Sequence, residues 1–115
     1  MKVAVVGSRT LTGIDLAPYI PAEATAIVSG GAKGVDALAA EYARRRGLPL
    51  WIYRPDYDRY GRAAPIVRNR TIAENCDLLV AVWDGFSRGT SYTVEYAKKI
   101  RKPYRVYLIP SKETI

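Results

Sequence analysis

A glycine-rich stretch, Ser29-Gly30-Gly31-Ala32-Lys33-Gly34-Val35-Asp36, has the residue types and spacing of an anion-binding turn. It follows the apolar run 26–28 and opens a segment whose apolar residues recur at helical spacing. Glycines at such a junction let backbone N–H groups approach a phosphate, and the helix dipole favours negative charge there. The candidate phosphate ligands are Ser29, Gly30, Gly31 and Lys33. In the alternative interpretation, the glycines only permit the positive φ of a tight turn.

Asp36 falls in the first turn of the helix that this stretch opens. A carboxylate at that position can accept a hydrogen bond from a ribose hydroxyl. It can equally complement the positive end of its own helix. Both interpretations of Asp36 therefore stay open from the sequence.

Two further loops carry glycines and hydrogen-bond donors directly after apolar runs. The first is Gly7-Ser8-Arg9-Thr10 and the second is Asp84-Gly85-Phe86-Ser87-Arg88-Gly89-Thr90. In open α/β sheets, ligands bind outside the carboxyl ends of the strands, where the strand order reverses. The candidate ligand contacts in these loops are Gly7, Ser8, Arg9, Asp84, Arg88, Gly89 and Thr90. For the first loop, the alternative is a polar turn with a solvated arginine.

An amide side chain interrupts the apolar face of the helix expected over 65–75. Asn69 falls near the middle of a face that also carries Ile66, Ile72, Ala73 and Cys76. A buried amide must be hydrogen-bonded, because leaving it unpaired costs a few kcal/mol. We expect Asn69 to tie loop backbones together and to contact a ligand. The long loop 54–62 before this helix carries arginines and two tyrosines that suit a base or a phosphate, or is an ordinary solvated loop.

The elements that position these residues follow from five apolar runs at 3–6, 26–28, 50–53, 78–83 and 105–109. Helical or turn segments separate them, which predicts an α/β fold with right-handed crossovers. The first and fourth runs are almost continuously apolar, as central strands of a parallel sheet should be. We therefore predict a single-domain, Rossmann-like open parallel sheet of about five strands, with helices on both faces. The domain spans 1–115, with 111–115 as a loose tail.

The amino-acid composition excludes several kinds of catalytic and metal site. The chain has no histidine and one cysteine, so a histidine-based dyad or a zinc site is not expected, and we predict neither a metal nor a cofactor. No run reaches the roughly 20 apolar residues of a membrane span, so we expect a cytoplasmic protein with no membrane partner. The net charge of +7 suggests acidic ligands or nucleic acid. One basic group needs no ligand, because it complements helix C-termini: Arg44, Arg45, Arg46, Lys98, Lys99 and Arg101.

Four motifs together resemble the SLOG superfamily (DprA/Smf–LOG-like), and above all its small stand-alone YspA-like branch. They are Gly7-Ser8-Arg9, the 29–36 stretch, Arg68-Asn69-Arg70 and the 84–90 loop. The resemblance covers nearly the whole chain and implies a nucleotide-derived ligand held over the strand C-termini, as in a sensor. A homodimer is a further expectation from the family. The DprA relatives imply single-stranded DNA binding as an alternative.

The LOG relatives imply a second alternative, hydrolysis of the N-glycosidic bond of a nucleoside monophosphate. They use an arginine, matched here by Arg68, and a glutamate three residues after a Gly-Thr pair. Thr93 takes the place of that glutamate, and Glu95 lies two residues later, about 200° around the helix. Arg68 and Glu95 are therefore the catalytic candidates if the protein is an enzyme. The other interpretation of Glu95 is a surface ion pair with Lys99.

Overall fold

The computed structural model describes residues 1–110, so the loose tail predicted for 111–115 lies outside the described part. Its five strands form one parallel sheet in the order β3-β2-β1-β4-β5. The predicted α/β class is confirmed, and the two almost continuously apolar runs, 3–6 and 78–83, form neighbouring inner strands of the sheet. The strands are β1 (Lys2–Gly7), β2 (Ala26–Ser29), β3 (Leu50–Ile52), β4 (Leu78–Trp83) and β5 (Tyr104–Leu108).

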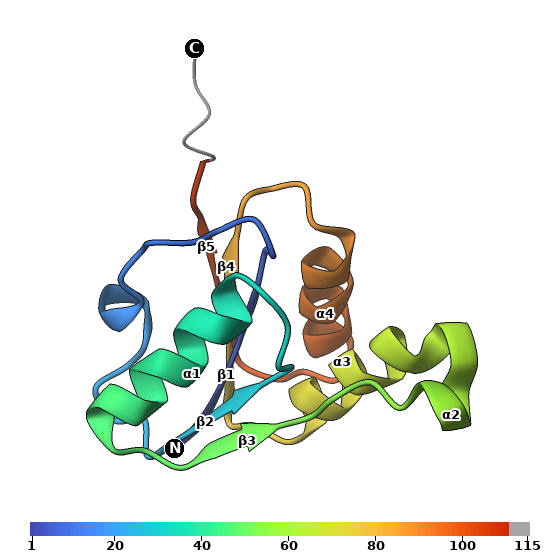
Figure 1. The fold of residues 1–115 in the computed structure, drawn as a ribbon, viewed down its shortest axis with the longest axis horizontal. Coiled ribbons are helices and arrows are strands. Elements are labelled where there is room, and N and C mark those ends of the chain that lie inside the picture. Colours follow the sequence, from blue (N-terminus) through green and yellow to red (C-terminus); the bar gives the residue numbers. More distant parts are fainter. Residues whose placement is uncertain (111–115) are drawn as a thin grey trace.

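Helices cover both faces of the sheet (Figure 1). The 3₁₀ turn η1 (Ala17–Tyr19) and helix α1 (Val35–Arg46) lie on one face, and α3 (Ala64–Glu74) and α4 (Arg88–Lys99) on the other. The first crossover holds only a 3₁₀ turn, because Pro18 and Pro21 interrupt it. The short α2 (Tyr57–Tyr60) and η2 (Gly61–Ala63) occupy the predicted long loop and project beyond α3.

The central strand β1 shows why its sequence is continuously apolar. Val3 and Val5 pack into the core under α1, whereas Ala4 and Val6 pack under α3 and α4. Because side chains alternate between the two faces of a strand, a sheet covered on both sides needs apolar residues at every position. The carboxyl end of β1 therefore lies between those of β2 and β4, with helices on both sides of the sheet.

The predicted apolar face of the helix over 65–75 is wrong at one residue. Ile66 is 43% exposed, because it lies in the first turn of α3 beside the exposed segment 57–63. On α4, Tyr96 turns its hydroxyl to Glu74 of α3, and Val94 is buried. The contact between α3 and α4 therefore determines which side chains of α4 are buried on this side of the sheet. Among residues 1–110, no helix has the length and apolar character needed to cross a membrane.

Candidate functional site

A cavity of about 420 Å³ lies at the carboxyl ends of β1 and β4. The chain leaves β1 toward one edge of the sheet and later returns to β4 beside it, so this is the point where the strand order reverses. Its walls come from the loops after both strands, from the glycine-rich stretch, and from residues 65–72 of α3 and 89–93 of α4. The cavity therefore lies where the sequence predicts the ligand site.

The structure brings nine of the predicted site residues together around this cavity. They are Gly7, Ser8, Arg9, Asp36, Arg68, Asn69, Asp84, Gly89 and Thr90. The other six do not line it. Ser29 and Gly30 are buried and Gly31 is half-buried, whereas the side chains of Lys33, Arg88 and Glu95 are exposed to solvent.

The glycine-rich stretch packs directly on the loop after β1. Gly34 has φ +68° and ψ −125°, and a Cβ atom there would lie 2.4 Å from the carbonyl oxygen of Ser8. The same oxygen accepts a hydrogen bond from the Val35 N–H at 3.2 Å. Glycine is required here both for the backbone conformation and for this close approach. The start of α1 is thereby joined to β1.

Asp36 is 8% exposed, and its carboxylate accepts a hydrogen bond from the Ala32 N–H at 3.0 Å. Burial raises the pKa of this carboxyl, while that hydrogen bond and the charges of Arg68 and Arg9 oppose the rise. The carboxylate closes its own loop and also forms part of the cavity wall. Both interpretations from the sequence are therefore compatible with its position.

The loop after β4 satisfies its own amides. Asp84 Oδ1 accepts hydrogen bonds from the N–H groups of Phe86, at 2.8 Å, and Ser87, at 3.1 Å. These bonds, that of Phe86 first, hold the pKa of the Asp84 carboxyl below its usual range. Ser8, which is buried, accepts the Asp84 N–H through Oγ at 2.9 Å and so joins the two loops. The N–H groups of Phe86 and Ser87 are therefore not free to bind a phosphate, which would need backbone N–H groups farther along the chain.

The first turn of α4 provides them. Ser87 caps this helix, its Oγ accepting from the Thr90 N–H at 3.3 Å. The backbone N–H groups of Arg88 and Gly89 then begin the helix, where amides lack an intrahelical partner. Gly89 and Thr90 line the cavity, so the positive end of the helix dipole opens into it.

Arg68 joins three segments around the cavity. Its Nη1 donates to the carbonyl oxygen of Gly30 at 2.6 Å and to that of Tyr53 at 3.5 Å. Its Nε donates to Oδ1 of Asn69 at 2.8 Å. The predicted role of tying loop backbones belongs to Arg68, because the Asn69 oxygen is directed to this guanidinium. The half-buried Arg68 thus links α3 to the glycine-rich loop and to the end of β3.

The two residues compared in the LOG-like interpretation lie in different places. Thr93 is buried, lines the cavity and donates its hydroxyl to the Gly89 carbonyl at 2.8 Å. Glu95 is exposed and does not line the cavity, and it pairs with Lys98 at 3.0 Å rather than with Lys99 as predicted. No carboxylate of α4 reaches the cavity.

Several wall residues were not among the site predictions. They are Val6, Thr10, Ala32, Pro65, Ile72, Phe86, Ser87 and Thr93. Thr10, Ala32, Phe86 and Ser87 belong to loops that the sequence did identify, so their positions in those motifs were the available signal. Ile72 and Val6 are buried core residues that also line the cavity, and no sequence pattern separates them from the rest of the core.

The two aspartates of the cavity predict opposite pH dependences of stability. Because the pKa of Asp36 is raised in the folded state, the contribution of this residue to the free energy of unfolding falls as pH rises from about 4, the unfolded value, through the raised value. Because the pKa of Asp84 is lowered in the folded state, its carboxylate stabilises the fold above about pH 4. This stabilisation is lost as pH falls through the lowered value. From pH 4 to 7, Asp36→Asn should therefore gain stability relative to the wild type.

Asp84→Asn should lose stability relative to the wild type as pH rises from the lowered pKa of Asp84 to about 4, and then stay level. Urea unfolding of the three proteins at steps of pH measures both differences. Parallel pH profiles for the two variants would contradict the opposite environments of the two carboxylates.

Comparison with known proteins gives one family and two similar structures. The profile of the family described as "YspA, cpYpsA-related SLOG family" matches residues 15–60. No curated protein matches the chain significantly. The SLOG resemblance predicted from the sequence is thereby confirmed, and the two structures below share the fold over nearly the whole chain.

Both structures are of DNA processing protein A. The X-ray structure of DprA from Streptococcus pneumoniae is 25% identical with a TM-score of 0.72, covering 97% of this chain and 51% of that one. The protein from Helicobacter pylori, described for its single-stranded DNA binding mode, is 23% identical with a TM-score of 0.73. That match covers 99% of this chain and 68% of the other. The chain thus spans about half to two thirds of these proteins.

Proposed function

We propose that the cavity binds a nucleotide-derived ligand with its phosphate at the N-terminus of α4. One observation carries the proposal: the first turn of α4 opens into a cavity that Arg9 and Arg68 also line. Backbone amides and guanidinium groups are the donors that phosphate oxygens take. Thr90, at the same helix end, also lines the cavity, and its hydroxyl donates to Oγ of Ser87 at 3.0 Å.

The rest of the cavity suits the sugar and the base. Asp36 and Asn69 supply polar atoms for hydroxyl groups, and both line the wall. Phe86 lies at the rim of the cavity with 84% of its surface exposed, which leaves its ring free to stack on a base. We do not extend the proposal to hydrolysis, because Thr93 occupies the cavity position that a glutamate fills in the LOG-like pattern.

A thermal-shift screen against nucleoside mono-, di- and triphosphates, NAD, ADP-ribose and cyclic nucleotides tests this function. A ligand that binds only the folded state adds about 2.7 kcal/mol at 100 times its dissociation constant, which is easily measured. A selective shift for one class supports the pocket and identifies the compound to study. Absence of a shift across the panel would refute the nucleotide site.

Two exposed cations give a matched test of the site. Arg9 lines the cavity, whereas Lys33 is exposed nearby and does not line it. A charged hydrogen bond to phosphate contributes about 1.5–3 kcal/mol, so Arg9→Ala should weaken nucleotide binding about tenfold or more. Lys33→Ala removes the same charge and should change affinity less than about twofold. Equal losses would show that net charge, and not the cavity, attracts the ligand.

We infer a second candidate function, single-stranded DNA binding, from the likeness to DprA and from the exposed segment 54–62. Tyr57 and Tyr60 there are 59% and 38% exposed, and the guanidinium of Arg59 lies 5.3 Å from the Tyr60 ring. Such side chains can stack on bases beside a phosphate chain. Affinity that grows with oligonucleotide length and falls steeply with salt supports this candidate, and preference for a mononucleotide supports the first.

A further inference from the structure

Strand β5 forms one edge of the sheet, and among residues 1–110 no strand lies beyond it. The Pro103 carbonyl accepts a hydrogen bond from β4 at 3.0 Å, and the Ile109 N–H donates one to β4 at 2.8 Å. In a parallel ladder, successive residues direct their N–H and C=O groups to opposite sides of the strand. The residues whose backbone groups point away from β4 are therefore Tyr104, Val106 and Leu108.

The open edge of β5 has defined ends. Before it, Arg101 has a φ of +58°, and the Lys102 N–H donates to the Ala97 carbonyl at 2.9 Å, which closes the turn after α4. After it, Pro110 has no N–H to donate. The outward backbone groups available for pairing therefore lie within 104–108, with Val106 at the centre.

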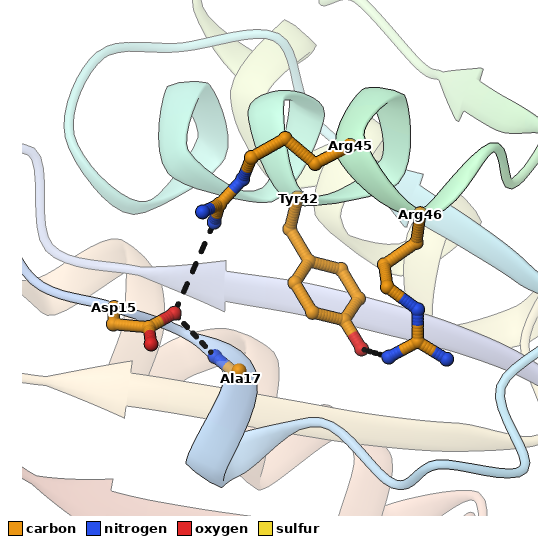
Figure 2. Close-up of polar contacts among 5 residues, drawn as sticks. All are labelled: Asp15, Ala17, Tyr42, Arg45 and Arg46. Carbon is orange, nitrogen blue, oxygen red and sulfur yellow. Dashed lines mark hydrogen bonds and ion pairs between the residues drawn. The ribbon is translucent and has the colours of Figure 1, made fainter.

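One face of β5 is covered by the chain itself. The ring centroid of Tyr107 lies 4.9 Å from that of Tyr19 in η1, on the side of the sheet that α1 covers. Asp15 holds η1 in place (Figure 2). Its carboxylate accepts the Ala17 N–H at 3.0 Å and pairs with Arg45 of α1 at 3.9 Å. On this side, η1 therefore packs over the strand.

The other face of β5 is apolar and largely uncovered. Tyr104, Val106 and Leu108 lie on the side of α3 and α4, where they are 40%, 40% and 63% exposed. The Lys98 ammonium lies 5.6 Å from the Tyr104 ring. Proteins usually protect an exposed edge strand with a charge, a proline, a bulge or a covering element, and this face of 104–108 carries no charge of its own. An apolar row beside outward backbone groups suits pairing with another strand.

We propose that β5 pairs antiparallel with β5 of a second copy of the chain, about a two-fold axis at Val106. In this register Val106 lies opposite its own copy, and Tyr104 lies opposite Leu108 of the second copy. All the outward backbone groups of 104–108 then have partners, whereas a register shifted along the strand leaves some of them unpaired. No residue of β5 lines the cavity, so the inference does not depend on the cavity's ligand.

The side chains of β5 are compatible with this self-pairing. Arg105 lies opposite Tyr107 of the second copy, whose ring attracts a guanidinium, and so does not meet another cation. On the other face, Tyr104 meets Leu108 of the second copy, and the two Val106 side chains meet each other. A two-fold contact uses the same surface on both copies, so it closes as a dimer and leaves no open edge of β5.

Antiparallel pairing also separates the basic ends of the two strands. Lys98, Arg101 and Lys102 lie just before β5. Tyr104, the first residue of β5, would lie about 13 Å along the strand from its own copy. This separation exceeds the Debye length of about 8 Å at physiological salt. The net charge of +7 on each copy opposes association, so association should strengthen as salt screens the repulsion.

Cysteine substitutions at two equally exposed positions test the register. Val106→Cys places two thiols opposite each other with Cα atoms about 5.5 Å apart, a distance that a disulfide spans. Tyr104 is 40% exposed, as Val106 is, but lies about 13 Å from its copy. Under mild oxidation, Val106→Cys should form a covalent dimer at least about tenfold faster than Tyr104→Cys. The native Cys76 is buried and should not compete. Equal rates would overturn the proposal.

Sedimentation equilibrium tests the pairing itself. Because β5 has only five residues, we expect a monomer–dimer equilibrium with a dissociation constant in the micromolar range. Val106→Lys places two cations at the two-fold axis and should weaken association at least about tenfold. Trp51→Lys is the matched control, because it adds the same charge at a 52% exposed position of β3, the opposite edge. It should weaken association less than about twofold.

Three results would each overturn the proposal. The first is a wild type that stays monomeric up to about 0.5 mM protein. The second is an equal loss of association in Val106→Lys and Trp51→Lys. The third is association that weakens as salt rises, because charge attraction and not strand pairing would then hold the copies together.

Discussion

Replacement of Gly34 by alanine should lower the free energy of unfolding by about 3 kcal/mol or more. The residue has φ +68° and ψ −125°, a conformation that costs a side-chain-bearing residue about 1–3 kcal/mol. The new Cβ would also lie 2.4 Å from the Ser8 oxygen and 2.6 Å from the backbone of Arg9. These are backbone atoms, so relief requires the loop after β1 to move. Urea unfolding measures the loss.

Gly47 provides the control for this substitution. Its φ of +65° is nearly the same, yet a Cβ atom there would have nothing within 4 Å. Gly47→Ala should therefore cost only the left-handed backbone term, about 1 kcal/mol. If the two substitutions cost the same, the contact between the glycine-rich loop and the loop after β1 does not determine stability. A Gly34→Ala protein as stable as the wild type would contradict the requirement for glycine at this contact.

The sheet could be predicted because its signals are local. The runs 3–6 and 78–83 are apolar at every position, and only a strand covered on both faces requires that pattern. The loops at the strand ends were also visible, because glycines and donors follow those runs directly. Since the carboxyl ends of parallel strands meet at one edge, the position of the cavity follows from the strand order.

The charges around the cavity could not be assigned in the same way. Lys33 and Arg88 belong to the right loops, but their long side chains extend into solvent, and sequence spacing does not determine that direction. Asp84 accepts the amides of Phe86 and Ser87, so part of the expected phosphate site is filled by the protein itself. That turn was readable as an aspartate bonding the backbone two residues ahead. The positive φ of Arg101 had no signal, since glycine is the usual residue there.

Of the substitutions at the cavity, Arg68→Ala should cause the largest combined loss of stability and nucleotide affinity. The guanidinium bridges the carbonyl oxygens of Gly30 and Tyr53, so its removal leaves both without their charged donor. For a half-buried group we expect a loss of about 2 kcal/mol in stability and about 100-fold in nucleotide affinity. Urea unfolding and calorimetric titration with the nucleotide found by the screen measure the two losses.

Arg70 provides a control on the same helix. It is exposed and donates to the Tyr92 hydroxyl at 2.7 Å, with its guanidinium also 5.6 Å from the Tyr96 ring. Arg70→Ala removes the same charge but no contact with the cavity, so nucleotide affinity should stay within about twofold, and stability should fall less than in Arg68→Ala. Arg68→Lys keeps the charge but loses the planar guanidinium that donates to several acceptors at once. Its stability and nucleotide affinity should lie between those of the wild type and of Arg68→Ala. Equal affinity losses for the two alanine variants would refute the role of Arg68.

The pH dependence of the Arg68→Ala loss identifies its cause. The Arg68 charge opposes the burial that raises the pKa of Asp36, so removing the charge should raise this pKa further. A raised carboxyl pKa costs stability progressively as pH increases above about 4, the unfolded value. The deficit of the variant should therefore be larger at neutral pH than near pH 4. A deficit that does not change with pH would mean that Arg68 acts through its bonds to Gly30 and Tyr53, independently of the Asp36 charge.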